Sequence, residues 1–245
     1  MATIHRNKLN RLYTHVAPGT PLTSHDLAVL GISADLAVHY VRAGWLQRLA
    51  RGVYCRPNDP PALHPSLVLL QRSFEGLHVG GKSALDWHGI RQYLSQRPVL
   101  HLYGWKAGRL PQWFTERFPA EYHRKRLFKE EPGALLHIRP IENRKGGPLV
   151  SAPERALLEV LSEVGVRQPL QEARELVEST YSLRADVLRE LLKRCTSVKT
   201  VRLCLQLGHE LSQPWAGKLD PSQLPKGSDR PWVSRSGDGL LVLKP

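Results

Sequence analysis

The stretch GWLQRLARGVYCRP, residues 44–57, concentrates side chains that can bind a polyanion. Arg48 and Arg51 lie there among alternating apolar residues. The planar guanidinium group of arginine pairs well with phosphate oxygens. Just upstream, His39 and Arg42 can donate to base acceptors or to phosphates. These residue types predict contacts with the backbone and the groove of duplex DNA.

The residues before this stretch predict two short helices that would position those donors. Thr23 is suited to cap the first helix, and Asp26 three residues later favours the positive end of the helix dipole. Gly31 supplies a turn, and Ser33 caps a second helix that ends at Gly44. Two helices joined in this way form a helix-turn-helix, whose second helix enters the major groove.

A basic hairpin is expected directly after the second helix. Strands at 45–49 and 53–54, joined by the turn 50–52, would form the wing of a winged helix and contact phosphate or the minor groove. On the helix itself, small residues would allow close approach to base edges, and the outer face is expected to hold Ala34, Ala37, Val38, His39 and Arg42. The candidate DNA-binding residues, including two arm contacts near the N-terminus, are Lys8, Arg11, Thr23, Ser24, Ser33, Ala34, Val38, His39, Arg42, Arg48 and Arg51.

The charge balance supports a nucleic-acid partner. The net charge is +13, and a basic surplus of that size attracts polyanions. Residues 1–57 hold seven Lys and Arg against two acidic residues, residues 58–150 hold fourteen against eight, and residues 151–245 hold fourteen against twelve. The positive surplus therefore lies in the first two thirds of the chain. A second basic patch is expected within YHRKRLFK, formed by Arg124, Lys125, Arg126 and Lys129.

One stretch has the form of an enzyme motif. GLHVGGKS, Gly76–Ser83, fits the phosphate-binding pattern G-x-x-x-x-G-K-[ST]. That mechanism needs a buried strand directly before the first glycine, and the preceding LVLLQRSFE favours a helix. No later apolar strand ends in the aspartate that would hold Mg²⁺. A strand edge followed by a helix is the favoured interpretation, with nucleotide binding as the alternative.

Other catalytic and metal patterns are missing from the sequence. No Asp or Glu is followed by Lys two positions later, as many nuclease sites require, and no G-x-S-x-G nucleophile elbow occurs. The three cysteines form no C-x-x-C pair, and the eleven histidines form no H-x-x-x-H pair. We therefore expect a protein that is not an enzyme, with no cofactor and no metal site.

The proline-rich segment RPNDPP, residues 56–61, predicts a domain boundary. The expected fold class is α+β, with a winged helix-turn-helix at 1–57 followed by a larger mixed α/β domain at 62–245. That domain divides into a mixed part at 62–150 and a mainly helical part at 151–245. No apolar run is long enough to span a membrane, and the N-terminus has no signal-peptide core, so the cytoplasm is the expected location.

Four blocks in the same order resemble the AbiEi family, the antitoxins of type IV toxin–antitoxin systems. The first block is PLTSHDLAVLGISADLAVHYVRAGWLQRLARGVYCRP, which is similar to the family's N-terminal winged helix. The others are VGGKSALDWHGI, SAPERALLEVL and VRLCLQLGHELSQPWAGKLD. The resemblance therefore covers most of the chain.

The resemblance implies a transcriptional repressor that binds inverted repeats in the promoter of its own operon. It also implies that the C-terminal domain counteracts a nucleotidyltransferase toxin without a stable complex between the two proteins. An alternative of a different class is a winged helix that binds protein instead of DNA.

Overall fold

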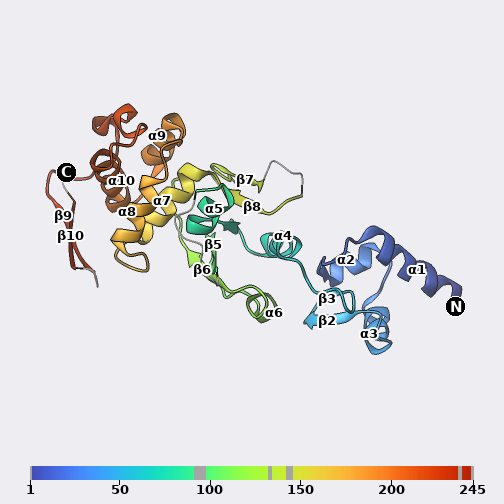
Figure 1. The fold of residues 1–245 in the computed structure, drawn as a ribbon. Helices are drawn as coiled ribbons and strands as arrows, with labels where there is room; N and C mark the ends of the chain where they lie inside the picture. Colours follow the sequence, from blue (N-terminus) through green and yellow to red (C-terminus); the bar gives the residue numbers. More distant parts are fainter. Residues whose placement is uncertain (1, 91–97, 132–133, 142–145, 237–238, 244–245) are drawn as a thin grey trace.

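The computed structural model describes residues 2–90, 98–131, 134–141, 146–236 and 239–243. Helices and mixed sheets alternate along the chain, so the predicted α+β class is confirmed. Figure 1 shows an elongated molecule, with the N-terminal helices at one end and the C-terminal hairpin at the other.

The N-terminal unit contains three helices and a small antiparallel sheet. Its strands pair in the order β1-β3-β2, with Leu22 opposite Tyr54 and Arg48 opposite the same residue on the other side. In chain order its elements are α1 (Ala2–His15), β1 (Leu22–Thr23), α2 (Ser24–Val29), α3 (Ala34–Arg42), β2 (Gln47–Ala50) and β3 (Val53–Cys55).

The caps expected from the sequence define the two short helices. Thr23 and Asp26 form a capping box at the start of α2, because each side chain accepts from the other residue's backbone N–H. Gly31 follows with φ of +80°, a conformation that favours glycine and lets the chain turn between the helices. The Ser33 hydroxyl then accepts from the Leu36 N–H at the start of α3.

The second unit begins with α4 (Leu63–Ser73) and a five-stranded mixed sheet of order β6-β5-β4-β8-β7. β4 lies at its centre, antiparallel to β5 and parallel to β8, while β5 and β6 run parallel. The elements are β4 (His78–Val79), α5 (Gly81–Trp87), β5 (Leu100–Gly104), α6 (Gln112–Thr115), β6 (Ala120–Arg124), β7 (Ile138–Pro140) and β8 (Leu149–Ser151).

Helices dominate the remainder, as the sequence predicts. Beyond the helices, two antiparallel strands pair, with Trp232 opposite Leu243. The elements are α7 (Pro153–Glu163), α8 (Leu170–Glu178), α9 (Ala185–Arg194), α10 (Val198–Glu210), two 3₁₀ turns (Ala216–Lys218 and Pro221–Gln223), β9 (Trp232–Ser236) and β10 (Gly239–Leu243).

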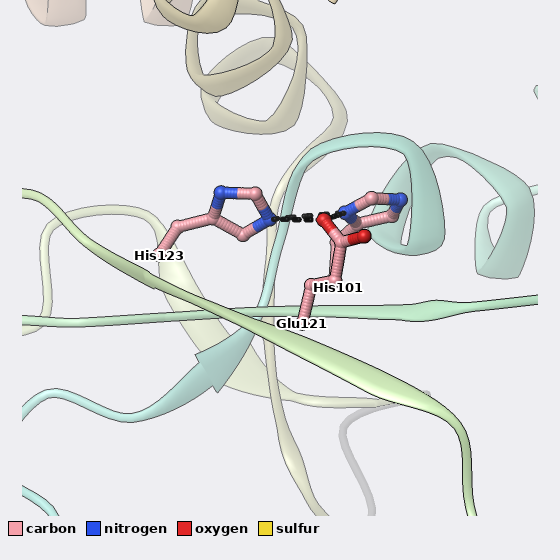
Figure 2. Close-up of side chains that lie close together, drawn as sticks. All are labelled: His101, Glu121 and His123. Carbon is pink, nitrogen blue, oxygen red and sulfur yellow. Dashed lines mark hydrogen bonds and ion pairs between the residues drawn. The ribbon is translucent and has the colours of Figure 1, made fainter. Parts of the chain in front are cut away.

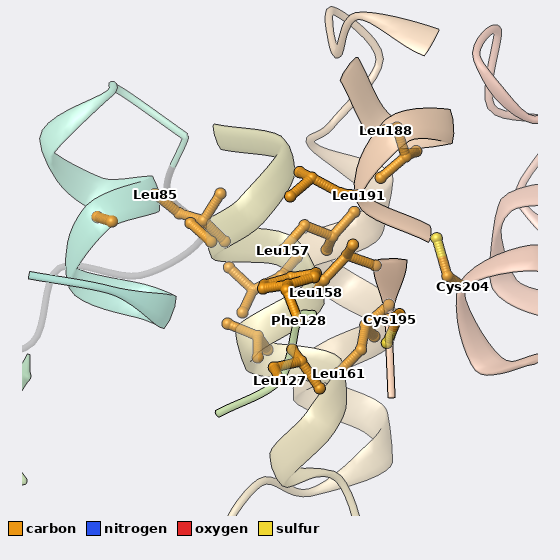
Figure 3. Packing of buried hydrophobic residues seen from close by; sticks show 14 of the residues in the cluster. Leu85, Leu127, Phe128, Leu157, Leu158, Leu161, Leu188, Leu191, Cys195 and Cys204 are labelled. Atoms are coloured by element: carbon orange, nitrogen blue, oxygen red, sulfur yellow. The ribbon is translucent and has the colours of Figure 1, made fainter. Parts of the chain in front are cut away.

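Helix α7 runs through the middle of the larger core. Every residue from Glu154 to Glu163 is buried, which is the pattern of a helix enclosed on all sides. Figure 3 shows Leu157, Leu158 and Leu161 of this helix packed around Phe128 and against leucines of α9.

Buried apolar residues form two separate clusters, one for each unit. The smaller runs from Leu12 to Tyr54, and the larger from Leu67 to Leu243. Leu49, Ala50 and Val53 of the β2–β3 hairpin pack against the larger cluster. Within the described residues, no helix combines the length and apolar character needed to cross a membrane.

Candidate nucleic-acid interface

The second helix of the pair, α3, exposes one face and buries the other. Leu36, Ala37 and Tyr40 are buried, so the expectation that Ala37 lies on the outer face was wrong. It lies three residues before Tyr40 and faces the core with it. The exposed side chains are those of Ser33, Ala34, Asp35, Val38, His39 and Arg42. The five candidate DNA-binding residues on or capping this helix, Ser33, Ala34, Val38, His39 and Arg42, are therefore accessible.

The β2–β3 hairpin, which the sequence predicts to be the wing, follows α3 and is joined to the start of α2. Arg48 and Arg51 are both exposed, and the Arg48 Nε–H donates to the Ala50 carbonyl at 3.3 Å. Gly52 has φ of +74°, and its carbonyl accepts from the Ser24 N–H at 3.0 Å. The exposed Ser24 therefore lies beside the wing turn.

Arg56, the next arginine along the chain, is turned toward the protein and not toward solvent. Its guanidinium donates to the carbonyls of Leu12, Tyr13 and Val16 at the end of α1. Its planar group also lies 4.9 Å from the centre of the Tyr13 ring. A cation on the last carbonyls of a helix offsets the negative end of the helix dipole, so Arg56 fixes α1 to the sheet.

Thr23 is held inside the helix cap. Its hydroxyl donates to Asp26 Oδ2 at 2.8 Å and accepts from the Asp26 N–H at 3.1 Å. The Arg72 guanidinium of α4 binds the other oxygen of the same carboxylate at 3.0 Å. Thr23 thus orders the start of α2.

The two arm candidates lie on α1. Arg11 is exposed, while Lys8 is half-buried. A Cβ placed on Gly31 would lie 3.8 Å from Lys8 Cε, so the lysine stem covers the turn between α2 and α3. Such a stem can pack on the protein while the ammonium group stays in water.

The second basic patch is smaller than the sequence predicted. Arg124, Arg126 and Lys129 are exposed, and Arg126 lies over the Trp105 ring. Lys125 points inward, where its Nζ donates to the Ser162 carbonyl at 3.0 Å and to Glu163 at 2.6 Å. The reason is strand alternation, which sends neighbouring residues to opposite faces. Lys125 is therefore removed from the patch.

The geometry of Gly76–Ser83 does not match a phosphate-binding loop. Strand β4 lies inside the motif instead of before it, and α4 precedes it. The Gly81 N–H, which would face a phosphate, donates to Glu159 Oε2 at 3.0 Å. The Lys82 ammonium group pairs with Glu172 at 3.0 Å. A buried carboxylate thus takes the place that a nucleotide phosphate would need.

That carboxylate, Glu159 of α7, joins the helix to the sheet. It accepts from His78 Nε2 at 2.9 Å, from the Ser151 hydroxyl and from Arg155 Nε at 2.9 Å. Burial opposes ionisation of Glu159, but His78 and Arg155 outweigh it and lower its pKa to about 2. Glu159 therefore carries a compensated charge and holds the core together.

The structure also brings together three polar side chains that the sequence motifs did not single out. His101 of β5 lies beside Glu121 and His123 of β6, as Figure 2 shows. His101 Nδ1 and His123 Nε2 are 3.0 Å apart. Glu121 Oε2 lies 4.0 Å from the first and 3.9 Å from the second. A search for pairs two residues apart on strands would have noted the E-x-H of β6.

Both imidazoles of this cluster are neutral near pH 7. Burial, and then the neighbouring His123 and Lys82, lower the pKa of His101 to about 4. Burial also lowers the pKa of His123. Neutral imidazoles have one nitrogen lone pair available to accept a hydrogen bond or a metal ion.

Comparisons with known proteins assign both parts of the chain to the same family. Residues 5–96 match a family model described as the N-terminal domain of the AbiEi antitoxin transcriptional regulators. The chain also resembles the crystal structure of the RV2827C protein from Mycobacterium tuberculosis, with a TM-score of 0.56 and 16% sequence identity, over 92% of this chain and 87% of that one. None of the curated proteins compared with the sequence matches it. Residues 97–243 match the model described as "Transcriptional regulator, AbiEi antitoxin, Type IV TA system". The chain therefore belongs to the AbiEi family of type IV antitoxin transcriptional regulators.

Proposed function

We propose that residues 1–57 form a winged helix-turn-helix that binds duplex DNA and represses transcription of the chain's own operon. Helix α3 enters the major groove, where His39 and Arg42 donate to base edges or phosphates. Arg48 and Arg51 of the wing bind the flanking backbone, and the exposed Ser33 adds a donor at the start of α3. The chain acts by binding and does not catalyse a reaction.

One observation carries this proposal. From Ser33 to Val53 the charged side chains are Asp35 and the arginines at 42, 48 and 51, and all four are exposed. Leu36, Tyr40 and Leu46 of the same segment belong to the smaller core below them, while the hairpin residues Leu49, Ala50 and Val53 pack against the larger one. An accessible helix face followed by a cationic hairpin is suited to a groove and its phosphates.

The test is DNA binding by fluorescence anisotropy at two salt concentrations. One duplex carries the region upstream of the chain's own reading frame, and a second carries the same bases in scrambled order. We expect tighter binding to the first, and weaker binding to both as salt rises, because phosphate contacts release counterions. Equal affinity for the two duplexes would contradict sequence-specific repression, and affinity that does not change with salt would contradict the phosphate contacts.

We further propose that the chain counteracts a nucleotidyltransferase toxin without forming a stable complex. The family's description as a type IV toxin–antitoxin system supports this function. Co-expression with a nucleotidyltransferase encoded next to it should restore growth, while a tagged antitoxin should not retain the toxin during purification. Retention of the toxin at equal amounts would contradict the absence of a stable complex.

A protein partner for the same surface is the second candidate. Val29, Val38 and Trp45 are large apolar residues that are 70%, 46% and 41% exposed. Exposed large apolar side chains can take part in a protein interface. Failure of the chain to bind either duplex would favour this candidate.

A further inference from the structure

The His101–Glu121–His123 cluster follows directly from the pairing of two parallel strands. His101 is in register with Glu121, and Tyr103 with His123. Side chains two residues apart lie on the same face of a strand, and neighbouring strands in register share that face. The three side chains are therefore fixed by the pairing of two neighbouring strands of the sheet, which is a rigid support for a binding site.

The distances between the three ligand atoms suit a metal ion. His101 Nδ1, His123 Nε2 and Glu121 Oε2 form a triangle with sides of 3.0, 3.9 and 4.0 Å. A point about 2.1 Å from all three atoms exists in the plane of the triangle, within the usual range of about 2.0–2.2 Å for zinc bound to histidine and carboxylate. Tetrahedral zinc lies out of that plane, so on binding the two nitrogens must move slightly apart and the carboxylate oxygen must move closer to them. Figure 2 shows both nitrogens turned toward the same carboxylate oxygen.

The surroundings leave room for a further ligand. The cluster borders a cavity of ≈ 30 Å³ that is also lined by Tyr103, Val160 and Gln168. A bound water needs about 10–15 Å³, so the cavity can hold one beside the ion. We propose that His101, Glu121 and His123 bind a zinc ion, with a water molecule as the fourth ligand.

Zinc is favoured by the types of the donor atoms. Two imidazole nitrogens and one carboxylate oxygen suit a borderline-soft ion, whereas Mg²⁺ prefers oxygen ligands in octahedral geometry. Two nearby lysines are already paired, Lys82 with Glu172 and Lys125 with Glu163. Arg167 is the cation in direct contact with a ligand residue, since its Nη1 lies 3.1 Å from His123 Nδ1.

Arg167 therefore competes with the ion for the lone pair of His123. Its N–H donates to Nδ1, so the proton of the neutral ring is on Nε2, which donates to His101 Nδ1. Binding zinc through Nε2 requires that this proton move to Nδ1, with no net proton released by the ring. Glu163 Oε2 lies 4.0 Å from Nδ1 and is placed to accept a hydrogen bond from the resulting Nδ1–H once Arg167 turns away. A carboxylate on the second nitrogen is the usual support of a metal-bound histidine.

The test is calorimetric titration of the full chain, stripped with a chelator, with ZnCl₂ and with MgCl₂. We expect one zinc ion per chain and no heat from magnesium beyond dilution. Zinc should also raise the melting temperature, because a ligand that binds only the folded state stabilises it. Cobalt at the same site should give the intense visible absorption of a tetrahedral ion.

Two variants decide whether the zinc lies in this cluster. Glu121→Gln, at a half-exposed position, removes the carboxylate charge and should abolish both the stoichiometric binding and the zinc-dependent rise in melting temperature. His209→Ala is the matched control, since His209 is exposed and outside the cluster, and it should bind as the parent does. Equal zinc binding by the parent and by Glu121→Gln overturns the proposal, and so does a parent that binds no zinc.

The zinc affinity of the Arg167→Gln variant distinguishes competition with the ion from a purely structural role of Arg167. Arg167 is exposed, and its removal takes away both a cation and the donor to Nδ1. We expect the zinc dissociation constant of this variant to be lower than that of the parent. The expected change is at least ~10-fold, which is the size of effect that residues contacting metal ligands have on metal affinity. Weaker binding by Arg167→Gln would show that the arginine supports the site and would overturn the proposed competition.

Discussion

At the scale of single residues, side chains of the same type take opposite roles at positions only a few residues apart. Arg51 stands exposed at the turn of the wing, whereas Arg56 donates to three carbonyls at the end of α1. Lys125 is likewise turned inward between the exposed Arg124 and Arg126. Residue type alone thus indicates that a side chain can bind an anion or a carbonyl oxygen. Its position in the strand or turn decides whether that group belongs to the protein itself or to a partner that approaches from solvent.

Arg51→Ala should weaken binding to every duplex by a similar factor. A phosphate contact carries no sequence information, so its loss lowers affinity uniformly and reduces the slope of log affinity against log salt by about one. Anisotropy titrations at several salt concentrations measure both effects. Lys218→Ala removes one exposed charge from the other end of the molecule and should leave the slope unchanged. Loss of affinity for a single sequence, at constant slope, would contradict the assignment.

Glu159→Gln should destabilise the fold by about 3–5 kcal/mol near neutral pH, because Arg155 and the other donors lose a buried partner. The pKa of Glu159 is lowered from 4.5 to about 2 in the folded state. The stabilisation of the fold by the Glu159 carboxylate is therefore complete at pH values above the unfolded-state pKa of 4.5. It fades as the pH falls from there toward the folded-state pKa of about 2. Urea unfolding across the acidic range should show the parent and the variant converging, and a constant difference would contradict this.

At the scale of elements, short helices depend on their caps. Helix α2 has six residues, too few to persist without outside support. That support is the Thr23–Asp26 capping box, the Ser24 N–H bond to the wing and the Arg72 ion pair. These contacts tie the first helix of the pair to the turn between β2 and β3 and to α4, so the orientation of α3 depends on them.

Thr23→Ala should cost about 1 kcal/mol of stability in the N-terminal unit, which is the usual effect of losing a capping hydroxyl. Hydrogen exchange of the α2 amides should become faster, since local opening becomes easier. Thr23→Ser keeps the capping oxygen and should exchange as the parent does. If Thr23→Ala instead lowered DNA affinity without changing exchange, the hydroxyl would be a phosphate contact and not a cap.

At the scale of the whole molecule, two cores are joined through α4 and the wing. The smaller cluster ends at Tyr54 and the larger begins at Leu67. The family models divide the chain elsewhere, between residues 96 and 97. That division falls after β4 and α5, although β4 is the central strand of the five-stranded sheet. We propose that the folding boundary is the proline-rich segment near residues 56–61.

Two fragments test this boundary. Residues 1–60 keep the whole small cluster, whereas residues 1–96 also carry β4 and α5 without their partners in β5, β8 and α7. We expect the longer fragment to bind the dye ANS more strongly and to aggregate sooner, because it exposes apolar surface and unpaired strand edges. A compact fragment 1–96 that binds no ANS would place the boundary where the family models do.

The sequence by itself determined the elements whose signals are local. The caps at Thr23 and Ser33 and the turn at Gly31 depend on residues within a few positions of one another, and the structure forms them all. The family assignment also needed only the order of short blocks.

Tertiary structure alone decided which side chains meet across the chain. Parallel pairing of β5 with β6 brings His101 to Glu121 and His123, and packing of α7 brings Glu159 to His78 and Gly81. Those partners are separated by twenty to eighty-one positions. No local preference encodes such a distance, because strand register and helix packing are set by how the whole apolar core closes.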